Sequence, residues 1–401
     1  MSEPQSLKRT WTDRLTSRDA RDLSGVWRYR ELLPFAENAP IVSLAEGNTP
    51  LYDAPRSASY CHLASLTLKH QGCNPTGSFK DTGMTTAVTQ AVTLGVQTVV
   101  CASTGNTAAS LAAYAARAGL VCAILVPSGQ VSLAKLAQSL DYGAIVLEVE
   151  GNFDDAMRMI RELAEDPSIY LVNSINPFRI EGQKTVAAEL LQQLDWKAPD
   201  HVVLPGGNLG NSSALGKGFR ELLHLGVIDR LPQLTVVQAE GAAPFAHLFA
   251  TRGDQKPTNL TPIRDPQTLA SAIKIGAPVS WPKALREINV SGGRAITVSE
   301  EEIADAKAII GRDGIGCEPA SATTVAGIKR LVWENIIGGD DTVVAVLTGH
   351  ILKDTDYVIN YHRGTLETPL GDRLKGRFTN SPIRVATTKE AILEALKRAT
   401  R

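Results

Sequence analysis

The chain has 401 residues, more than one hydrophobic core usually serves, so the sequence predicts two domains around a substantial buried interior. Its 41 basic and 42 acidic residues give a formal net charge of −1, which leaves no overall field to attract nucleic acid or a membrane surface. Nucleic-acid and membrane partners are therefore not expected.

The amino-terminal segment and the cysteines bear on the cellular compartment. Residues 1–30 carry charges throughout, which excludes the apolar stretch of a secretory signal. The five cysteines lie far apart and include no CxxC pair, so neither a disulfide framework nor a zinc site is indicated. The seven histidines form no metal-ligand motif, and no metal is expected. These features favour a protein of the reducing cytoplasm.

The first segment with chemical interest is NPTGSFKDTG, residues 74–83. After a Pro-Thr-Gly turn, Ser78 and Asp81 match the capping-box pattern, which places Lys80 in the first turn of a helix. A cation there opposes the helix dipole, so the neutral amine, the form that attacks an aldehyde, is favoured. A solvated surface lysine is the alternative that this segment alone leaves open.

Short runs rich in Val, Ile and Leu alternate with longer helical patterns. Because these runs are almost continuously apolar, they predict strands of a sheet that is covered on both faces. The repeated strand-helix order predicts an α/β fold with mostly parallel sheets flanked by helices. The expected strands are 96–103, 121–127, 144–149, 201–205, 234–239 and 342–348, and the expected helical stretches include 108–119 and 153–166.

Ligands of such sheets bind where loops leave the carboxyl ends of strands, and three polar segments follow expected strands. Residues 103–106, STGN, lead into an Ala-rich helix, where free N–H groups and hydroxyls suit a carboxylate or phosphate but equally a plain helix cap. Residues 205–211, PGGNLGN, let backbone N–H groups converge on an anion, although a structural turn is equally compatible. This loop has neither the Walker nor the GxGxxG spacing, so an NAD site is not expected. The third segment is TGH, residues 348–350.

Two further segments carry structural predictions only. Residues 251–267 are polar and Pro-rich and are expected to form a long loop. The run SEEEIADA, beginning at Ser299, predicts an exposed helix with an N-cap and a negative first turn.

Three features together meet the requirements of pyridoxal phosphate. They are a lysine that can attack an aldehyde, a helix start that can bind an anion and a separate glycine loop. Six strings, in order along the chain, resemble the motifs of threonine synthases. They are EGNTPL (46–51), NPTGSFKDTGM (74–84), STGNTAAS (103–110), NSINPFRIEGQKT (173–185), GGNLGN (206–211) and LTGHILKD (347–354). Agreement across six blocks is specific, whereas a single block would not be.

The resemblance implies a two-domain, tryptophan-synthase-β-like architecture, the fold type II of pyridoxal-phosphate enzymes. A smaller domain would close over the substrate, with Gly72 and Gly182 as candidate hinges. The expected parts are an amino-terminal arm (1–45), a smaller domain with the lysine and the asparagine loop (46–180), a larger domain with the glycine loop (181–385) and a carboxyl-terminal helix (386–401).

The resemblance also implies the cofactor-binding residues. Lys80 would form the Schiff base, Asn106 would contact the ring hydroxyl and Thr348 would contact the pyridine nitrogen. A neutral hydroxyl cannot hold that nitrogen protonated as an aspartate would, so the ring would withdraw electrons less strongly than a protonated ring. The cofactor phosphate would be held by Gly206, Gly207, Asn208, Leu209, Gly210 and Asn211.

By the same resemblance, the substrate is O-phosphohomoserine. A guanidinium offers a fork of donors suited to its phosphate, although outside this motif Arg179 would be interpreted as a surface ion pair. Ser103, Thr104 and Thr107 would bind the substrate carboxylate, and Asn173, Ser174, Arg179 and Lys184 would bind its phosphate.

The implied reaction converts O-phospho-L-homoserine and water to L-threonine and phosphate by γ-elimination and β-hydration. Two alternatives stand beside it: a threonine or serine dehydratase, which eliminates at Cβ, and a noncatalytic relative that binds a phosphorylated metabolite. Threonine synthases with a long amino-terminal arm include some that S-adenosylmethionine activates at a dimer interface. A homodimer and an S-adenosylmethionine effector are therefore expectations of the resemblance.

Overall fold

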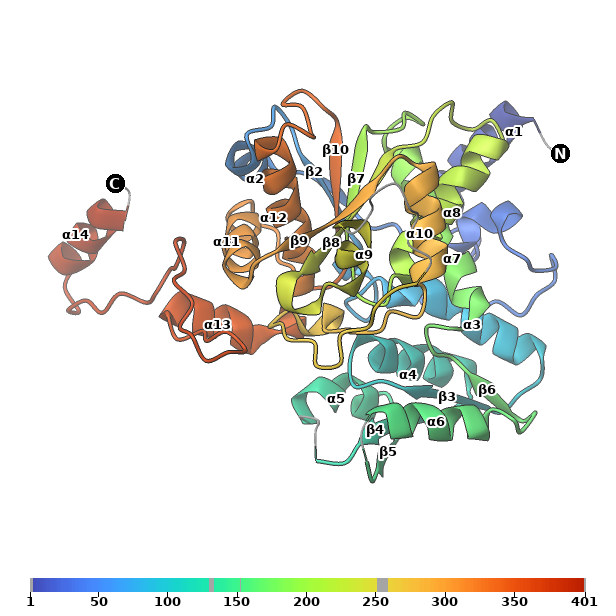
Figure 1. Cartoon of the computed structure of the whole chain (residues 1–401). Coiled ribbons are helices and arrows are strands. Elements are labelled where there is room, and N and C mark those ends of the chain that lie inside the picture. Colours follow the sequence, from blue (N-terminus) through green and yellow to red (C-terminus); the bar gives the residue numbers. More distant parts are fainter. Residues whose placement is uncertain (1–2, 130–132, 152, 251–258, 400–401) are drawn as a thin grey trace.

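The computed structural model describes residues 3–129, 133–151, 153–250 and 259–399. Its strands form two sheets (Figure 1). The larger sheet has the order β1 (Leu51–Asp53), β2 (Thr67–His70), β10 (Val343–Leu347), β7 (His201–Pro205), β8 (Gln233–Ala239) and β9 (Arg294–Val298). The smaller sheet has the order β5 (Ile145–Val149), β4 (Val121–Pro127), β3 (Thr98–Ala102) and β6 (Ile169–Leu171).

The strand pairing confirms an α/β fold with mostly parallel sheets. All the pairs are parallel except the one between β1 and β2. The six predicted strands are all present, as β3, β4, β5, β7, β8 and β10. The sequence did not predict β1, β2, β6 or β9.

Helices flank both sheets. The predicted helix at 108–119 is α4, and the one at 153–166 is α6, which ends three residues earlier than predicted. The helices are α1 (Pro4–Asp13), α2 (Pro55–Cys61), α3 (Lys80–Thr93), α4 (Asn106–Ala118), α5 (Leu133–Asp141), α6 (Phe153–Leu163), α7 (Pro177–Gln193), α8 (Gly210–His224), α9 (Pro244–Ala250), α10 (Trp281–Val290), α11 (Glu300–Arg312), α12 (Pro319–Trp333), α13 (Thr355–Arg363) and α14 (Lys389–Ala399).

The predicted cap of α11 is present, but the helix is not exposed as expected, because one side of it, including Ile303 and Ile310, is buried. The Ser299 hydroxyl accepts a hydrogen bond from the Glu302 N–H at 3.2 Å, and the Glu302 carboxylate accepts one from the Ser299 N–H at 2.8 Å. Three acidic residues occupy the first turn, where the helix dipole favours negative charge.

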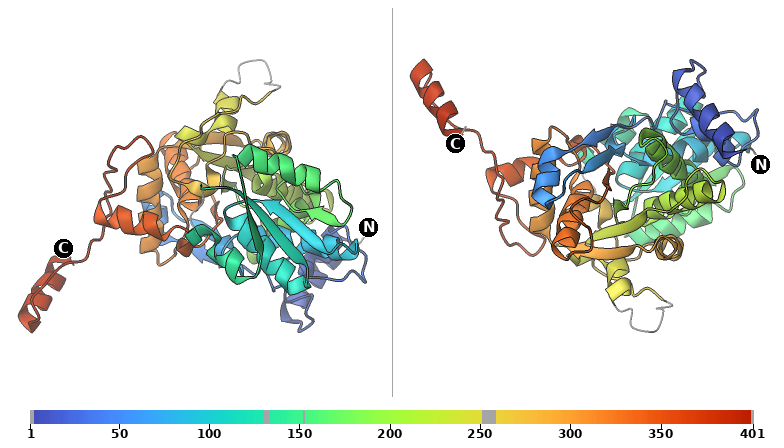
Figure 2. Two further views of the ribbon diagram at one scale, coloured as in Figure 1. Left: turned by 90° about the horizontal axis from the view of Figure 1, so that it is seen from below. Right: turned by 90° about the horizontal axis from the view of Figure 1, so that it is seen from above.

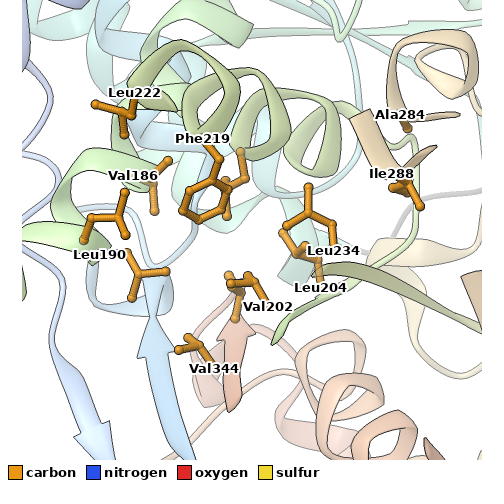
Figure 3. Close-up of a cluster of buried hydrophobic side chains, with 14 of the residues drawn as sticks. Val186, Leu190, Val202, Leu204, Phe219, Leu222, Leu234, Ala284, Ile288 and Val344 are labelled. Carbon is orange, nitrogen blue, oxygen red and sulfur yellow. The ribbon is translucent and has the colours of Figure 1, made fainter. Parts of the chain in front are cut away.

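The larger sheet buries both faces, which explains its almost continuously apolar strands. Val202, Leu204 and Val344 pack against α7, α8 and α10 on one face (Figure 3). Val203 and Ala345, which point the other way along the same strands, pack with α2, α11 and α12. The smaller sheet is covered in the same manner, by α3 and α4 on one face and α6 on the other.

The predicted amino-terminal arm is packed onto the larger sheet's core. Trp11 and Tyr29 are fully buried in it, and the Tyr29 hydroxyl donates to Gln192 Oε1 at 2.6 Å. The division of the chain at residue 180 stays a prediction. Strand pairing departs from it in one respect, because β1 and β2, expected in the smaller domain, join the larger sheet.

The helices α3 and α7 cross closely between the two sheets. A Cβ atom on Gly182 would lie 2.0 Å from the Thr82 carbonyl oxygen, and one on Gly83 would lie 2.7 Å from the Arg179 carbonyl oxygen. Gly182 therefore serves close packing between helices. Gly72 is confined in the same way, since a Cβ there would lie 2.6 Å from the His350 nitrogen. Both glycines thus have a packing role, and a hinge at either one stays a prediction.

The carboxyl-terminal segment leaves this body. Helix α14 stands apart at the end of an extended stretch in all the views (Figures 1 and 2). Of the long loop predicted at 251–267, residues 251–258 lie outside the described part, and 259–267 contain no helix or strand. None of the helices in the described ranges is long and apolar enough to cross a membrane.

Candidate active site

One cavity of about 770 Å³ lies where the chain leaves the carboxyl ends of β3, β6, β7 and β10. Its volume is in the range of pockets that hold a cofactor or a small ligand. Segments from both sheets line it, so residues far apart in sequence meet there. The predicted site residues that line it are Lys80, Ser103, Thr104, Asn106, Thr107, Asn173, Ser174, Arg179, Gly207, Asn208, Leu209, Gly210, Asn211 and Thr348.

Lys80 is the first residue of α3, as predicted, and its side chain borders the cavity. Its Nζ lies 3.8 Å from the centroid of the Phe79 ring. Burial, with a smaller contribution from the Arg179 guanidinium, lowers the pKa of Lys80 to about 7, although Glu318 acts in the opposite direction. About half of the Lys80 amines are therefore uncharged at pH 7, and the uncharged amine is the form that attacks a carbonyl carbon.

The predicted capping box before α3 is wrong. The Ser78 hydroxyl accepts only a long bond from the Lys80 N–H at 3.4 Å, and α3 has no side-chain cap. The Asp81 carboxylate instead accepts from the Thr76 N–H at 2.7 Å, the Thr76 hydroxyl at 2.6 Å and the Ser110 hydroxyl at 2.5 Å. Burial raises the pKa of Asp81 to about 6. Because Ser110 belongs to α4, this buried carboxylate ties the start of α3 to α4.

The glycine loop turns sharply between β7 and α8. Leu209 adopts a left-handed conformation, with φ of 63°, directly before the helix. Gly206 does not line the cavity: it lies under β8, where a Cβ would be 2.4 Å from Val236 Cγ1. No described protein group accepts a hydrogen bond from the backbone N–H of Gly207, Asn208 or Leu209. Free N–H groups at a helix start are a site for an anion.

Asn106 and Thr348 face the cavity from opposite sheets and share one partner. The Asn106 side-chain amide donates to Glu318 Oε2 at 3.0 Å, and the Thr348 hydroxyl donates to Glu318 Oε1 at 3.1 Å. Glu318 is 2 % exposed, and burial is the main cause that raises the pKa of its carboxyl group. Sequence reasoning missed Glu318, because a glutamate before Pro319 is typical of an ordinary helix start.

Arg179 is buried on α7 beside the cavity. It is 3 % exposed, and neither its Nε nor its Nη1 has a partner among the described residues. Burial lowers the pKa of this guanidinium to about 10. Since a buried charge without a counter-ion is costly, the arrangement favours an anion in the cavity.

The other residues predicted to bind the substrate phosphate are held differently. Both ends of the Asn173 side chain bond to the Ala102 backbone, at 3.0 and 3.1 Å, so Asn173 fastens its loop to the end of β3. The Ser174 hydroxyl accepts from Asn208 Nδ2 at 2.5 Å, which joins this loop to the glycine loop.

Lys184 does not belong to the cavity, contrary to expectation. Its ammonium forms ion pairs with Glu181 at 2.5 Å and Glu221 at 2.8 Å. Five residues of α-helix turn by about 140° from Arg179, which directs Lys184 away, whereas four residues turn by only about 40°. Gln183, four residues from Arg179, does line the cavity and was not predicted. Helical periodicity is the signal that distinguishes the two.

The cavity's chemistry fits pyridoxal phosphate together with a phosphorylated amino acid. Arg179 Nε and Nη1, Gln183 Oε1 and Asn211 Oδ1 are buried polar atoms that lack protein partners in the described ranges. The two Arg179 nitrogens are donors and can be satisfied by oxygens of a ligand, whereas the Gln183 and Asn211 oxygens are acceptors and can be satisfied by hydrogens of a ligand. The Lys80 amine can attack a carbonyl carbon. No group of three or more His, Cys, Asp or Glu residues within the described ranges could hold a metal ion.

The known proteins that this chain resembles agree with the chemistry of the cavity. The family model described as pyridoxal-phosphate dependent enzyme matches residues 42–349. The threonine synthase of Methanocaldococcus jannaschii is 52% identical over 336 residues, which cover 84% of this chain and 82% of that protein. The threonine synthase of Mycobacterium bovis is 46% identical over 330 residues, which cover 82% of this chain and 88% of that protein.

Solved structures share the fold at much lower identity. The L-serine ammonia-lyase of Rhizomucor miehei has a TM-score of 0.68 at 20% identity and covers 80% of this chain and 99% of that chain. The threonine deaminase isoform 2 of Solanum lycopersicum has a TM-score of 0.66 at 18% identity and covers 87% of this chain and 85% of that chain.

Proposed function

Since the chain belongs to the pyridoxal-phosphate dependent enzymes, and within them to the threonine synthases, we propose how its residues divide the work of that reaction. A threonine synthase converts O-phospho-L-homoserine and water to L-threonine and phosphate. The observation that carries the proposal is the presence, around one cavity, of a near-neutral amine at Lys80 and two separate anion sites. One anion site is the glycine loop, and the other is Arg179.

The first anion site suits the cofactor. Pyridoxal phosphate, when bound, supplies an aldehyde carbon for an amine and a ring that withdraws electrons from the neighbouring carbon. In this proposal Lys80 holds the aldehyde carbon, and the glycine loop, residues 206–211, holds the phosphate. Asn106 binds the ring hydroxyl and Thr348 the ring nitrogen.

The second anion site distinguishes the substrate. Arg179 binds the phosphate group of O-phosphohomoserine through its free guanidinium nitrogens, and Ser174 lies in the adjoining loop. Ser103, Thr104 and Thr107, at the start of α4, bind the substrate carboxylate with hydroxyls and helix N–H groups. An enzyme for unphosphorylated serine or threonine has no use for a buried arginine without a counter-ion.

Lys80 moves the protons. With the substrate nitrogen on the cofactor, the near-neutral Lys80 amine would accept the proton of the substrate Cα and pass it to the cofactor carbon that bears the substrate nitrogen. The amine would then be free to accept a proton from Cβ. Arg179 holds the phosphate as it leaves Cγ. Cγ then takes up one of these protons and becomes the methyl group. Water adds its hydroxyl at Cβ and gives its other proton to the released phosphate, and Lys80 returns the remaining proton to Cα. The buried position of the site limits stray water before that step.

The proposal is tested by two assays on the cofactor-loaded protein. With O-phosphohomoserine we expect phosphate and threonine in equal amounts, and with threonine no 2-oxobutyrate. The reverse pattern would identify a dehydratase, and no turnover of either compound would identify a noncatalytic binder.

The Arg179 assignment is tested by substitution. Arg179→Ala is expected to raise KM for O-phosphohomoserine by 10-fold or more, since a charge-assisted bond contributes about 1.5–3 kcal/mol. The affinity for pyridoxal phosphate should change little. Arg179→Lys is the matched control, which keeps the charge and loses the fork, and should lie between the two. Equal losses for cofactor and substrate would reject the assignment.

We also propose a homodimer and an S-adenosylmethionine effector, which the resemblance to threonine synthases implies. Sedimentation of the full chain tests the first, and phosphate release with and without S-adenosylmethionine tests the second. A cytoplasmic location is supported by the five cysteines, all of which are free thiols.

A further inference from the structure

The carboxyl group of Glu318 is held in a fixed place beneath the cavity. Glu318 is the N-cap residue of α12, but its side chain does not cap the helix and is instead hydrogen-bonded to Asn106 and Thr348. Its backbone N–H donates to the Gly349 oxygen at 3.0 Å. A Cβ on Gly349 would lie 2.3 Å from Glu318 Cδ and Oε2, so the chain leaves room for this carboxyl group by having glycine there.

The hydrogen bonds around Thr348 fix the direction of its hydroxyl. The hydroxyl oxygen of Ser321 accepts hydrogen bonds from the Thr348 N–H at 2.8 Å and from the Gly349 N–H at 3.2 Å, which fill both of its acceptor positions. The Ser321 hydrogen therefore donates to Thr348 Oγ1, 3.2 Å away. The Thr348 hydrogen is donated to Glu318 Oε1. A hydroxyl oxygen has two acceptor positions, so one acceptor position of Thr348 remains for a ligand.

An acceptor in that place requires a ligand atom that carries a hydrogen. We propose that Glu318 is a positioning residue for this reaction: through the Thr348 hydroxyl it shares one proton with the ring nitrogen of the cofactor and keeps that nitrogen protonated. The inference rests on the proposed function, because it takes Thr348 as the partner of the ring nitrogen. A neutral hydroxyl alone could not hold the proton, but a hydroxyl backed by a carboxylate can.

The proton can occupy two positions without any change in the number of protons. In one, the ring nitrogen keeps its hydrogen and donates it to Thr348, which donates its own to the Glu318 carboxylate. In the other, the N–H bond breaks as a new Thr348 O–H bond forms, and the original Thr348 hydrogen passes to Glu318 Oε1. The first position pairs a positive ring with a carboxylate, and the second leaves both neutral.

The contacts of Glu318 favour the first position. Asn106 and Thr348 each donate to a different carboxylate oxygen, which stabilises the charged form. The titratable groups facing Glu318 are Lys80, Lys353, Cys317 and Asp354; among them Lys80 favours the carboxylate and Asp354 opposes it. Burial also opposes it, and the positive ring, one hydroxyl away, offsets burial. A protonated ring withdraws electrons more strongly, which would ease removal of the Cα proton by Lys80.

Glu318→Gln is the sharpest change, because its amide can satisfy every partner. With the amide oxygen toward Asn106 and its NH₂ group toward Thr348, the Thr348 hydrogen is released to donate to an unprotonated ring nitrogen. The variant should therefore bind the cofactor and lose the proton. Asp354→Asn is the matched control, since it removes a neighbouring negative charge while the bond from the Thr348 hydroxyl to Glu318 is kept.

The test uses the full chain loaded with pyridoxal phosphate that carries ¹⁵N in its ring. We expect the ¹⁵N chemical shift of a protonated pyridine in the unchanged protein and in Asp354→Asn, and that of an unprotonated pyridine in Glu318→Gln. An unprotonated nitrogen in the unchanged protein, or a protonated one in Glu318→Gln, would overturn the inference. If Glu318→Gln does not load cofactor, Thr348→Ser should keep the protonated shift and Thr348→Val should lose it, and equal shifts in these two would overturn it as well.

The two proposals fail in different ways. Phosphate release from O-phosphohomoserine by the unchanged protein tests the proposed function and does not depend on the ring shift. If the ¹⁵N shift changes in Glu318→Gln as expected but the unchanged protein releases no phosphate from O-phosphohomoserine, this inference is upheld and the proposed substrate is rejected.

Discussion

In the protein freed of cofactor, the Lys80 amine is expected to titrate near pH 7, whereas an ordinary lysine titrates near pH 10.4. The main cause is burial beside the cavity, and the Arg179 guanidinium adds to it. At pH 7 about half of the Lys80 amines would then be neutral, against about four in ten thousand for an ordinary lysine. The cavity would thus enrich the reactive form by a factor on the order of a thousand.

Trace labelling with a small amine reagent, read peptide by peptide with mass spectrometry, measures this titration directly. The exposed Lys283 on α10 is an internal reference in the same sample. Labelling of Lys80 should level off above about pH 8, while that of an ordinary lysine rises about tenfold per pH unit. Accessibility changes the amplitude of the Lys80 curve and leaves its midpoint in place. A Lys80 curve that keeps rising about tenfold per pH unit up to about pH 10 would refute the reasoning.

Arg179→Met separates the two causes. It removes the positive charge and keeps an apolar chain of similar length, so the midpoint of Lys80 should rise yet stay below that of an ordinary lysine, because burial remains. A midpoint that falls in Arg179→Met would contradict the assigned electrostatics.

Three stability predictions follow from the packing. Gly182→Ala should lower the free energy of unfolding, measured by urea titration, by about 1–3 kcal/mol or more, because the added Cβ would overlap a carbonyl oxygen of α3. Gly311→Ala is the control: this glycine of α11 has open space around it, so the substitution should be neutral or stabilising. A larger loss in Gly311→Ala than in Gly182→Ala would contradict the packing. Lys69→Met should cost about 3–5 kcal/mol, because it leaves the buried Glu189 carboxylate without the ammonium 2.5 Å away; a loss below about 1 kcal/mol would show that water or another group compensates. Ser299→Ala should cost about 0.5–2 kcal/mol through the lost cap of α11, and an unchanged denaturation midpoint would show that the cap is dispensable.

The fold could be predicted from the sequence where burial is uniform. Strands covered on both faces are apolar along their whole length, and β3, β4, β7, β8 and β10 are buried along most of theirs. The sixth predicted strand, β5, is an edge strand without a buried position, and its apolar composition alone predicted it. The strands that were missed, β1, β2, β6 and β9, are three to five residues long. β1 and β6 have no buried position, and β2 and β9 mix buried with half-buried ones. Such short mixed patterns do not differ from those of loops, and only pairing with a neighbour makes them strands.

The site could be predicted where its residues are contiguous and could not where topology assembles it. The Lys80, Asn106 and glycine-loop segments are local motifs, and all of them border the cavity. Glu318 lies 212 residues from Asn106 and 30 from Thr348, and only the parallel order of the strands brings the three together. Its own sequence neighbourhood gives no sign of a ligand site.

Two local predictions failed for physical reasons. Asp81 matched a capping box, but its carboxylate finds better donors in the Thr76 backbone and in Ser110 of the adjoining helix. Lys184 lies in a motif that also supplies Arg179 to the cavity, but the turn of α7 directs its side chain to Glu221. In both cases tertiary contacts override the linear pattern.

The most direct test of the account is the position of the cofactor's covalent attachment. Borohydride reduction of the loaded protein makes the bond between the lysine nitrogen and the cofactor permanent, and mass spectrometry of its peptides then locates the added group. We expect a pyridoxyl group on the peptide that contains Lys80 and on no other. Attachment to another lysine, such as Lys274, which borders the same cavity, would contradict it.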